Sequence, residues 1–459
     1  MLQANFSNEI AKDLGGNYFT IDSNNNGEIE TTEALQVSYL DVNSSMISSL
    51  SGIFNFTNML ELRCYYNELT GMDFTGLQNL KRFFCGGNQI TALNVSSLSN
   101  IEVLWCEENL ITSLDLNGLT NLQNCNFNNN VISSLTFNNV NSLKYIYCSF
   151  NNLTTLDVSG LNNLIEMNVS FNLLTTLTVT NLNSFEKLNC SNNQLTSLDF
   201  SGTNNLKDLN CANNQINQSD LIGVDNVLYL NYSYNQLSIF NTANFTNLKS
   251  LDCSNNQLVV LNTNNLINLQ ELRCDYNLLT QLDVSTAINI WSLHCNNNQI
   301  QELDLNNLFN IFSLSVDNNN LTTLLMKNGS QQTTSATNLL GNSNLSFVCI
   351  DNNETTLGNY ITSLYPNCTV STDCSLDTSN IESYVSFMVV PNPASTFLNI
   401  ISNTDVAIFS VYVYNTLGQL MQINTNLNNT IDVSSLKTGN YFIKILSDKG
   451  SSIIKFIKE

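Results

Sequence analysis

The sequence predicts a mainly β fold: a solenoid of short parallel strands followed by a small antiparallel β-sandwich. First, a pattern of Leu, Cys and Asn recurs every 21 residues between about residues 43 and 330. A fixed period in the twenties is typical of a solenoid. Second, the half of each repeat that follows the Asn is too short for a helix of ordinary length. Third, the chain from about position 385 to its end abandons the repeat and alternates apolar and polar residues between turn residues, as antiparallel strands do.

The composition of the 459-residue chain argues against several classes of partner. Lys and Arg number 15 against 37 Asp and Glu, which gives a net charge of −22. Nucleic acids and anionic membrane surfaces both require basic patches, so we expect neither as a partner. No apolar run reaches 18 residues, so no transmembrane helix is predicted. We expect the protein to be a monomer.

Residues 1–42 are expected to form an N-terminal cap, because the end repeat of a solenoid would otherwise expose apolar core. Within this cap, Phe6, Ile10 and Leu14 fit one face of a helix.

The cap also contains a candidate calcium loop. Residues 22–33 match the pattern D-x-N-x-N-G-x5-E at every position. Gly15 and Gly16 interrupt the helix that would enter such a loop, so an ordinary paired EF-hand is not expected. The alternative is an Asn-rich turn that caps the following helix. The predicted Ca²⁺ ligands are Asp22, Asn24, Asn26, Glu28 and Glu33.

The repeat has the form L-x-x-L-x-C-x-x-N-x-L-x-x-L-x-V, as in residues 269–284, and occurs thirteen times without insertion or deletion. The Cys position, here called the Cys column, is Cys in nine repeats and Phe127, Val169, Tyr232 or Val316 in the others. The Asn position, the Asn column, is Asn in all thirteen: Asn67, Asn88, Asn109, Asn130, Asn151, Asn172, Asn193, Asn214, Asn235, Asn256, Asn277, Asn298 and Asn319.

This pattern resembles the leucine-rich repeat family over residues 43–330, and its second half is similar to a bacterial subclass with 21-residue repeats. The alternation in L-x-L-x-C independently predicts a short strand, and successive strands should stack at about 4.8 Å into a parallel concave sheet. The second half also alternates, so extended segments rather than helices are expected on the convex side.

Both columns favour structural interpretations. A buried amide must be satisfied, so the Asn column should bond backbone groups of its own coil and of the next one. Nine aligned thiols could suggest a metal or redox site. However, Phe, Val and Tyr replace Cys in this column, which indicates a core position with reduced, buried thiols.

The residue before each Cys-column position should point outward on the concave face. Exposed aromatic residues beside amides suit protein loops or glycans, although ordinary surface residues remain the alternative. Both Trp residues, Trp105 and Trp291, are expected on this strand. The predicted ligand-binding residues are Arg63, Tyr65, Phe84, Trp105 and Tyr147 towards the N-terminus, and Arg273, Trp291 and His294 towards the C-terminus.

Catalysis has little support in the sequence. His294 is the only histidine, and no nucleophile motif, phosphate loop or paired carboxylates stand out. We therefore predict a binding protein of adhesin type that recognises a protein or a glycan. A structural surface protein without a dedicated ligand is the alternative.

Residues 331–374 are expected to form a C-terminal cap. Cys349, Cys368 and Cys374 lie outside the 21-residue spacing, and two of them could pair in an oxidising compartment. The sequence leaves the pairing open.

Residues 375–388 are predicted to be a linker, and residues 389–459 carry a second set of motifs. These are Val390-Pro391-Asn392-Pro393, a turn at Gly418 and a strand after Gly439. They resemble the C-terminal sorting domain of the type IX secretion system of Bacteroidota, except that Val390 stands where that family usually has Tyr. The resemblance implies contact with the type IX machinery and a secreted or outer-membrane surface location. It also implies a signal peptide, and residues 1–14 lack its features. We therefore expect the native chain to begin upstream of Met1.

Overall fold

The computed structural model describes residues 1, 4–5, 7–217, 221, 223–374, 387–402, 408–415, 420–424, 430–447 and 450–459. The chain divides into two compact units, Met1–Cys374 and Ser375–Glu459. Most of the predicted linker, residues 375–386, lies outside the described residues. Among the described helices, none has both the length and the apolar character needed to cross a membrane.

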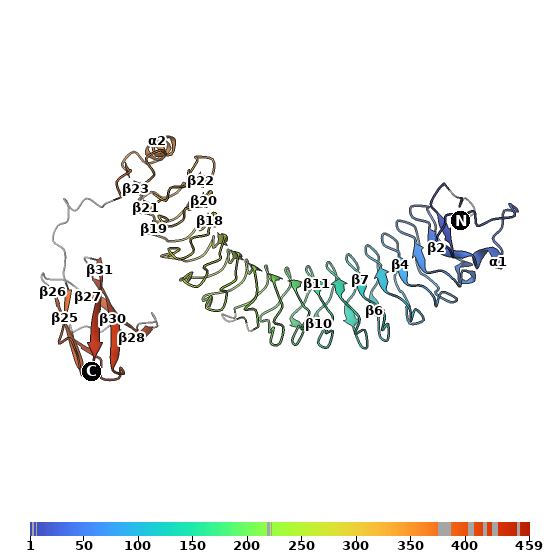
Figure 1. Ribbon diagram of the computed structural model, residues 1–459, viewed down its shortest axis with the longest axis horizontal. Coiled ribbons are helices and arrows are strands. Elements are labelled where there is room, and N and C mark those ends of the chain that lie inside the picture. The colour runs from blue at the N-terminus through green and yellow to red at the C-terminus, as the bar shows by residue number, and fades with distance from the viewer. Residues whose placement is uncertain are drawn as a thin grey trace. The chain divides into compact units, whose positions relative to one another are not determined.

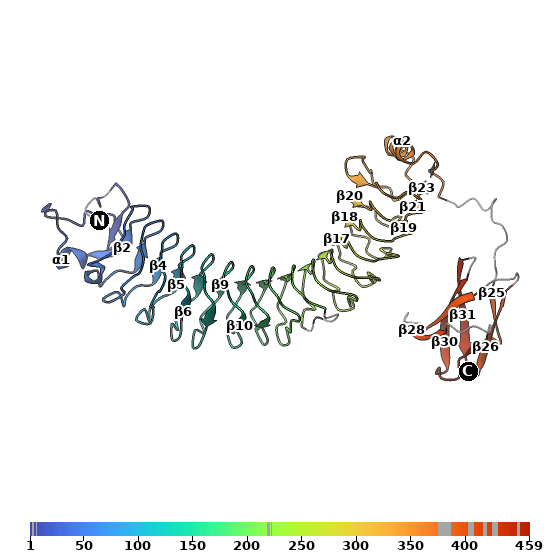
Figure 2. The same ribbon diagram turned by 180° about the vertical axis from the view of Figure 1, so that it is seen from behind.

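The first unit is a solenoid that curves into an arc, and one continuous sheet lines the inner side of the arc (Figures 1 and 2). All neighbouring strands in this sheet are parallel except β1 and β2, which are antiparallel. In spatial order the sixteen strands are β1 (Ala11–Asp13), β2 (Val37–Asp41), β3 (Glu61–Arg63), β4 (Arg82–Phe84), β5 (Val103–Trp105), β7 (Asn124–Asn126), β9 (Tyr145–Tyr147), β11 (Glu166–Asn168), β13 (Lys187–Asn189), β14 (Asp208–Asn210), β15 (Tyr229–Asn231), β16 (Ser250–Asp252), β17 (Glu271–Arg273), β18 (Ser292–His294), β20 (Ser313–Ser315) and β22 (Thr337–Asn338).

Residues that pair on neighbouring strands of this sheet occupy equivalent positions in successive repeats. Arg63 pairs with Phe84, and Phe84 pairs with Trp105, so each partner lies one repeat further along the chain. The predicted parallel concave sheet is therefore confirmed. It extends beyond the predicted limits 43–330, because β2 and β22 continue the stack, each through a coil slightly longer than the regular repeat.

The outer side of the arc consists of short extended segments and turns, as predicted. It carries three small parallel sheets, β6–β8, β10–β12 and β19–β21–β23–β24. Their strands are β6 (Ser113–Asp115), β8 (Ser134–Thr136), β10 (Thr155–Asp157), β12 (Thr176–Thr178), β19 (Glu302–Asp304), β21 (Thr323–Leu325), β23 (Phe347–Cys349) and β24 (Thr369–Ser371).

The N-terminal cap differs from the prediction of a helix through Ile10 and Leu14. Residues 11–13 form strand β1, which pairs with β2 and closes the sheet, and the Leu14 side chain is exposed. When β1 pairs with the open edge of the sheet, it satisfies backbone groups of β2 that a helix would have left without partners. This gain outweighs the helical spacing of the apolar residues in this segment. Helix α1 (Thr31–Ala34) and the 3₁₀ helix η1 (Ile53–Asn55) complete this end.

The Asn column forms a hydrogen-bonded ladder, hereafter the asparagine ladder, between successive coils. In Asn193, Nδ2 donates to the carbonyls of Cys190 and Val169, both at 3.0 Å. Its Oδ1 accepts the N–H of Leu174 at 3.0 Å. All thirteen members are buried, and Asn342 adds a further member in the C-terminal cap. The structural prediction is confirmed, but the linked coil is the preceding one, not the next.

A second, exposed Asn column escaped the sequence analysis. In Asn79, Nδ2 donates to the carbonyl of Thr57 at 2.9 Å, and Asn100 bonds Gln78 in the same way. The same bond recurs at Asn58, Asn121, Asn163, Asn205, Asn226, Asn268 and Asn289. Abundant Asn is therefore a scaffold property of this fold.

The Cys column lies in the core with reduced thiols, as predicted. Every column thiol is fully buried and unpaired. Burial raises the pKa of Cys148 and of Cys190 to about 12, which keeps these thiols protonated and unreactive. A tenth thiol, Cys125, occupies the Leu position between Leu104 and Ile146.

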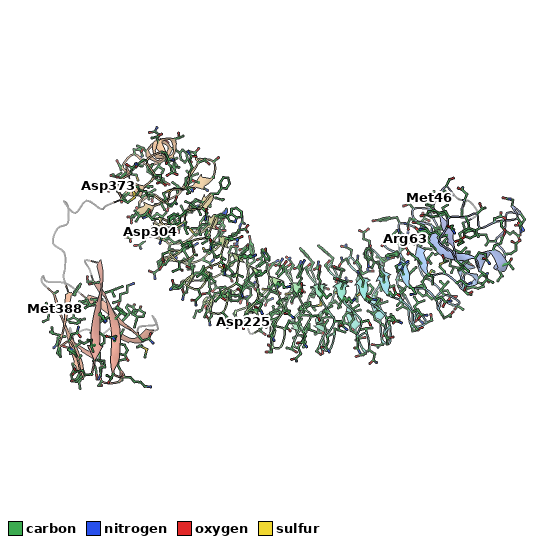
Figure 3. The ribbon with its side chains drawn as sticks, in the orientation of Figure 1. Met46, Arg63, Asp225, Asp304, Asp373 and Met388 are labelled. Atoms are coloured by element: carbon green, nitrogen blue, oxygen red, sulfur yellow. A yellow bond between two sulfur atoms is a disulfide. The ribbon has the colours of Figure 1, made fainter. Side chains whose placement is uncertain are left out.

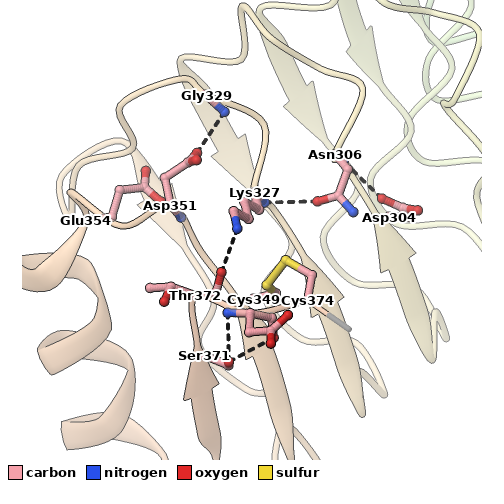
Figure 4. The surroundings of a disulfide bond; sticks show 11 residues. Asp304, Asn306, Lys327, Gly329, Cys349, Asp351, Glu354, Ser371, Thr372 and Cys374 are labelled. Atoms are coloured by element: carbon pink, nitrogen blue, oxygen red, sulfur yellow. Dashed lines mark hydrogen bonds between the residues drawn. A yellow bond between two sulfur atoms is a disulfide. The ribbon is translucent and has the colours of Figure 1, made fainter. Parts of the chain in front are cut away.

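The C-terminal cap contains helix α2 (Thr355–Leu364) and a disulfide. Cys349 at the end of β23 pairs with Cys374 after β24, with Cα atoms 5.5 Å apart (Figure 4). Cys368 is free and buried. The Lys327 ammonium donates to the carbonyl of Thr372 at 2.7 Å, so the last segment of this unit is fixed both covalently and by hydrogen bonding.

The second unit is the predicted antiparallel sandwich. One sheet has the order β25–β26–β29 and the other β28–β27–β30–β31. The core between them includes Leu398, Val411, Ile443 and Phe456. The strands are β25 (Phe387–Val390), β26 (Phe397–Ser402), β27 (Ile408–Asn415), β28 (Leu420–Asn424), β29 (Thr430–Asp432), β30 (Gly439–Ser447) and β31 (Gly450–Lys458).

Tyr232 provides a test of the Cys column. It is fully buried, and its hydroxyl has no hydrogen-bond partner. Phe127, also fully buried, shows that the column accepts a phenyl ring. Tyr232→Phe should therefore raise the free energy of unfolding by about 1 kcal/mol, because it removes an unsatisfied polar group. Urea denaturation, with the exposed Tyr229→Phe as control, measures the change. A destabilised Tyr232→Phe would contradict the core assignment.

Candidate functional site

The N-terminal end of the concave sheet carries a contiguous cluster of rings, hereafter the aromatic patch: Tyr65, Tyr66, Phe84 and Trp105. Ring centroids are 6.1 Å apart between Tyr66 and Tyr65 and 5.9 Å between Tyr65 and Phe84. Phe84 and Trp105 meet edge to face at 5.3 Å. The parallel register places these residues on, or within three residues after, three adjacent strands, which brings the predicted residues Tyr65, Phe84 and Trp105 together. Their role in binding stays a prediction.

Arg63 borders the aromatic patch on its N-terminal side and lies at the inner edge of the arc (Figure 3). Its guanidinium is centred 5.3 Å from the Phe84 ring and 5.5 Å from the Tyr39 ring. Its Nε also lies 2.6 Å from the buried Glu61 carboxylate, which pairs with Arg82 at the same distance. A polar hollow lined in part by Lys12, Tyr39 and Arg63 adjoins this end.

Exposure within the patch differs from the sequence prediction. Phe84 is buried, because Tyr65, Trp105 and Arg63 cover it. The Trp105 side chain is half-buried, and its Nε1 donates to Oδ1 of Asn124 at 3.0 Å. The predicted row of exposed aromatic side chains is therefore wrong for Phe84. Phe84 supports the rings on either side of it.

Tyr147 occupies the same outward column but is separated from Trp105 by Asn126. Its hydroxyl donates to Glu166 at 3.1 Å, and burial together with Glu166 raises its pKa to about 12. Tyr147 is thus tied to its neighbouring coil and stands apart from the aromatic patch.

Sequence reasoning missed one member of the patch, Tyr66, and the two glycines beside it. Tyr66 is 62% exposed, and Gly86 and Gly87 lie beneath the Tyr65 and Tyr66 rings. Tyr66 has a backbone φ of 52°, in the left-handed region that Gly and Asn usually occupy. The Gly-Gly pair, which no other repeat contains, was the signal available in the sequence.

The second predicted cluster is less compact. Arg273 and His294 are paired on β17 and β18, while Trp291 lies one residue before β18 and is 40% exposed. Trp291 was predicted on the strand, but β18 begins one residue after it. Burial and the charge of Arg273 lower the pKa of His294.

Asp275 lies beside this second cluster on a buried part of the concave face. Its Oδ1 accepts the N–H of Asn296 at 3.2 Å. Burial nevertheless raises the pKa of the carboxyl to about 6.

The candidate calcium loop adopts a closed turn. Both carboxylate oxygens of Asp22 accept backbone N–H groups, from Asn26 at 3.1 Å and Gly27 at 3.0 Å. Glu33 accepts the N–H and the hydroxyl of Ser23 at 2.7 and 2.8 Å. The side chains of Asn24, Asn26 and Glu28 are exposed.

Within the part of the chain that the structure describes, no group of three or more His, Cys, Asp or Glu residues is positioned to hold a metal. Gly27, at the sixth position of the loop, has the positive φ of 85° that the sharp turn of the motif requires. Calcium binding itself stays a prediction.

The sorting motif follows β25, an edge strand of one sheet, and is hydrogen-bonded to β31, an edge strand of the other sheet. Asn392 donates through Nδ2 to the carbonyl of Lys455 at 3.2 Å and accepts the N–H of Ile457 at 2.9 Å. Pro391 and Pro393 flank it, both preceded by cis peptide bonds. Gly439 begins β30, whereas Gly418 lies outside the described residues.

Comparison with known proteins agrees with this geometry. Residues 388–459 match the family described as the secretion system C-terminal sorting domain. The chain is a leucine-rich repeat solenoid that carries a C-terminal sorting domain. This domain marks the protein for export by the type IX system, to the cell surface or the surrounding medium.

Solved structures support the solenoid fold. The functional domain of InlJ from Listeria monocytogenes, which includes a cysteine ladder, aligns with a TM-score of 0.60 at 22% identity over 94% of this chain and 92% of that chain. A leucine-rich repeat protein of Leptospira interrogans aligns with a TM-score of 0.54 at 24% identity over 74% of this chain and 85% of that one. No curated protein matches the chain in sequence.

The raised pKa of Asp275 predicts how stability depends on pH. The folded state favours the protonated carboxyl, so this group destabilises the fold increasingly as pH rises from about 4 through 6. Asp275→Asn, which keeps an acceptor for Asn296, should raise the melting temperature at pH 8 and not at pH 4. The exposed Asp304→Asn controls for loss of charge alone. A gain for Asp275→Asn that is independent of pH would contradict this explanation.

Proposed function

We propose that the protein is an exported binding protein of adhesin type whose aromatic patch contacts a partner protein. The observation that carries the proposal is the contiguous set of rings at one end of the concave sheet. Aromatic side chains dominate the binding energy of protein interfaces, and rings already packed together lose little conformational entropy on binding. A solenoid also presents one long surface without covering loops.

The fold supports binding more directly than catalysis. The neighbours with known structures are leucine-rich repeat proteins. The only histidine has its pKa lowered by burial and Arg273, and it lies far along the sheet from the aromatic patch. A purely structural role on the cell surface is the competing function, and it predicts no saturable binding. A glycan ligand is an outcome of the same test.

Trp105→Ala tests the proposal. The labelled full chain is applied to arrays of extracellular proteins and glycans and to intact cells, and the strongest saturable interaction is titrated. The substitution should weaken this interaction by about 1–2 kcal/mol, the usual scale for an aromatic hot spot. The melting temperature should fall only slightly, because the half-buried side chain loses one ring contact and one hydrogen bond.

The matched control is Trp291→Ala at the other end of the sheet, which should leave the affinity unchanged. Binding to a glycan array alone would replace the protein partner. Unchanged affinity of Trp105→Ala for every ligand found would remove the patch from the function.

We also propose that the N-terminal loop binds Ca²⁺ through Asp22, Asn24, Asn26 and Glu33, with Glu28 contributing its backbone carbonyl. The match of residues 22–33 to the calcium-loop pattern supports this, as does the left-handed Gly27 at the sixth position. The bound ion would fix the cap that closes the sheet.

Calcium should raise the melting temperature of the protein by mass action on the folded state. Glu33→Gln should abolish this increment, because it removes the bidentate carboxylate of position 12. Glu28→Gln is the control and should keep most of the increment. If millimolar Ca²⁺ gives neither a melting shift nor a calorimetric binding heat, the loop is only an Asn-rich turn.

A further inference from the structure

Two adjacent glycines interrupt the side-chain columns of the concave face beside the aromatic patch. A Cβ atom on Gly86 would lie 2.8 Å from Cε1 of Tyr65 and 2.9 Å from Cδ of Glu107. A Cβ atom on Gly87 would lie 2.4 Å from Cδ1 of Tyr66. The Tyr65 and Tyr66 rings therefore rest on glycine backbone of the following coil, and the Glu107 carboxyl approaches Gly86 from the coil after that one.

Among the residues that the structure describes, no Lys, Arg or His forms an ion pair with the Glu107 carboxyl. Its Oε2 atom is buried and has no hydrogen-bond partner. Burial raises the pKa of the group, and a backbone hydrogen bond offsets only part of this effect. An acceptor atom without a partner is costly. The Glu107 side chain as a whole is only half-buried, so a cation from outside the chain can approach the carboxyl and offset this cost.

The cations on the neighbouring coils pair with other carboxylates. Arg63 and Arg82 both bind Glu61, each at 2.6 Å. Lys81 binds Glu102 at 2.9 Å. The site thus combines a half-buried carboxyl that takes no part in these ion pairs with aromatic rings, whose faces attract cations.

We propose that Glu107, together with Tyr65 and Trp105, receives a lysine or arginine side chain of the partner protein. The ammonium or guanidinium group would pair with the accessible part of the Glu107 carboxyl and lie against the rings. The inference rests on the proposed binding role of the aromatic patch and specifies its partner's chemistry. The net charge of −22 favours a basic partner segment and would accelerate its association.

The two tryptophans allow a direct test. Only two indole N–H signals exist, and Trp291→Phe assigns them. The full chain, labelled with ¹⁵N at Trp, is titrated with the peptide acetyl-Ser-Gly-Lys-Gly-Ser-amide. The Trp105 signal should shift and saturate, and the Trp291 signal should not. The same peptide with norleucine in place of Lys should produce no shift.

A matched pair of variants isolates the carboxylate. Glu107→Gln should raise the dissociation constant of the Lys peptide at least fivefold, whereas the exposed neighbour Glu108→Gln should change it less than twofold. Both remove one negative charge, so a general charge effect would give equal results. Gly86→Ala, which forces Tyr65 and Glu107 apart, should also weaken binding, and melting curves confirm that each variant folds.

Equal effects of Glu107→Gln and Glu108→Gln, or binding of the norleucine peptide, would overturn the inference. So would saturation of the Trp291 signal alone, or the absence of any shift at millimolar peptide. None of these results bears on whether Trp105→Ala weakens binding to a partner from the arrays. Failure of the cation site and failure of the patch as a binding surface can therefore be told apart.

Discussion

The hydrogen bonds of the asparagine ladder fix each coil of the solenoid to the one before it. A coil of this length turns sharply after each concave strand and leaves backbone carbonyls and N–H groups inside the molecule. Asn193 and its equivalents satisfy these groups in two coils at once. A buried unpaired backbone group costs about as much as a lost hydrogen bond, which explains why this position is Asn in all thirteen repeats.

The ladder also determines which side chains lie next to each other on the concave surface. A fixed repeat length places each outward side chain beside its equivalent in the next strand, so a run of aromatic residues along one column becomes a patch. The pairs Arg63–Phe84 and Phe84–Trp105 arise in this way. A residue that departs from the repeat pattern then marks a place where the concave surface differs from the other coils. The Gly86–Gly87 pair is such a departure, and it lies where Tyr65 and Glu107 converge.

The repeat was sufficient to predict the solenoid, the face of each column and the buried state of the thiols, because period and burial follow from local alternation. It could not predict the N-terminal strand β1, since the need to close the sheet edge overrides the helical spacing of Ile10 and Leu14. It also misjudged Phe84 and Trp291. Burial of Phe84 depends on which neighbours lean over it, and the strand begins one residue after Trp291. The repeat gave no indication that Glu107 differs from other surface carboxylates, because its oxygen without a hydrogen-bond partner is a property of the folded structure.

The most direct test of this account compares two asparagines in one repeat. Asn193→Ala removes a buried side chain that bonds Val169, Cys190 and Leu174. It should lower the free energy of unfolding by about 1–3 kcal/mol and accelerate hydrogen exchange of the Leu174 amide. Asn189→Ala removes a half-buried side chain whose bonds within the described chain are to the N–H and hydroxyl of Ser191. Water can replace these bonds, so the effect should stay below about 1 kcal/mol. Equal losses in the two variants, with unchanged exchange at Leu174, would contradict the claim that the ladder holds the coils in register.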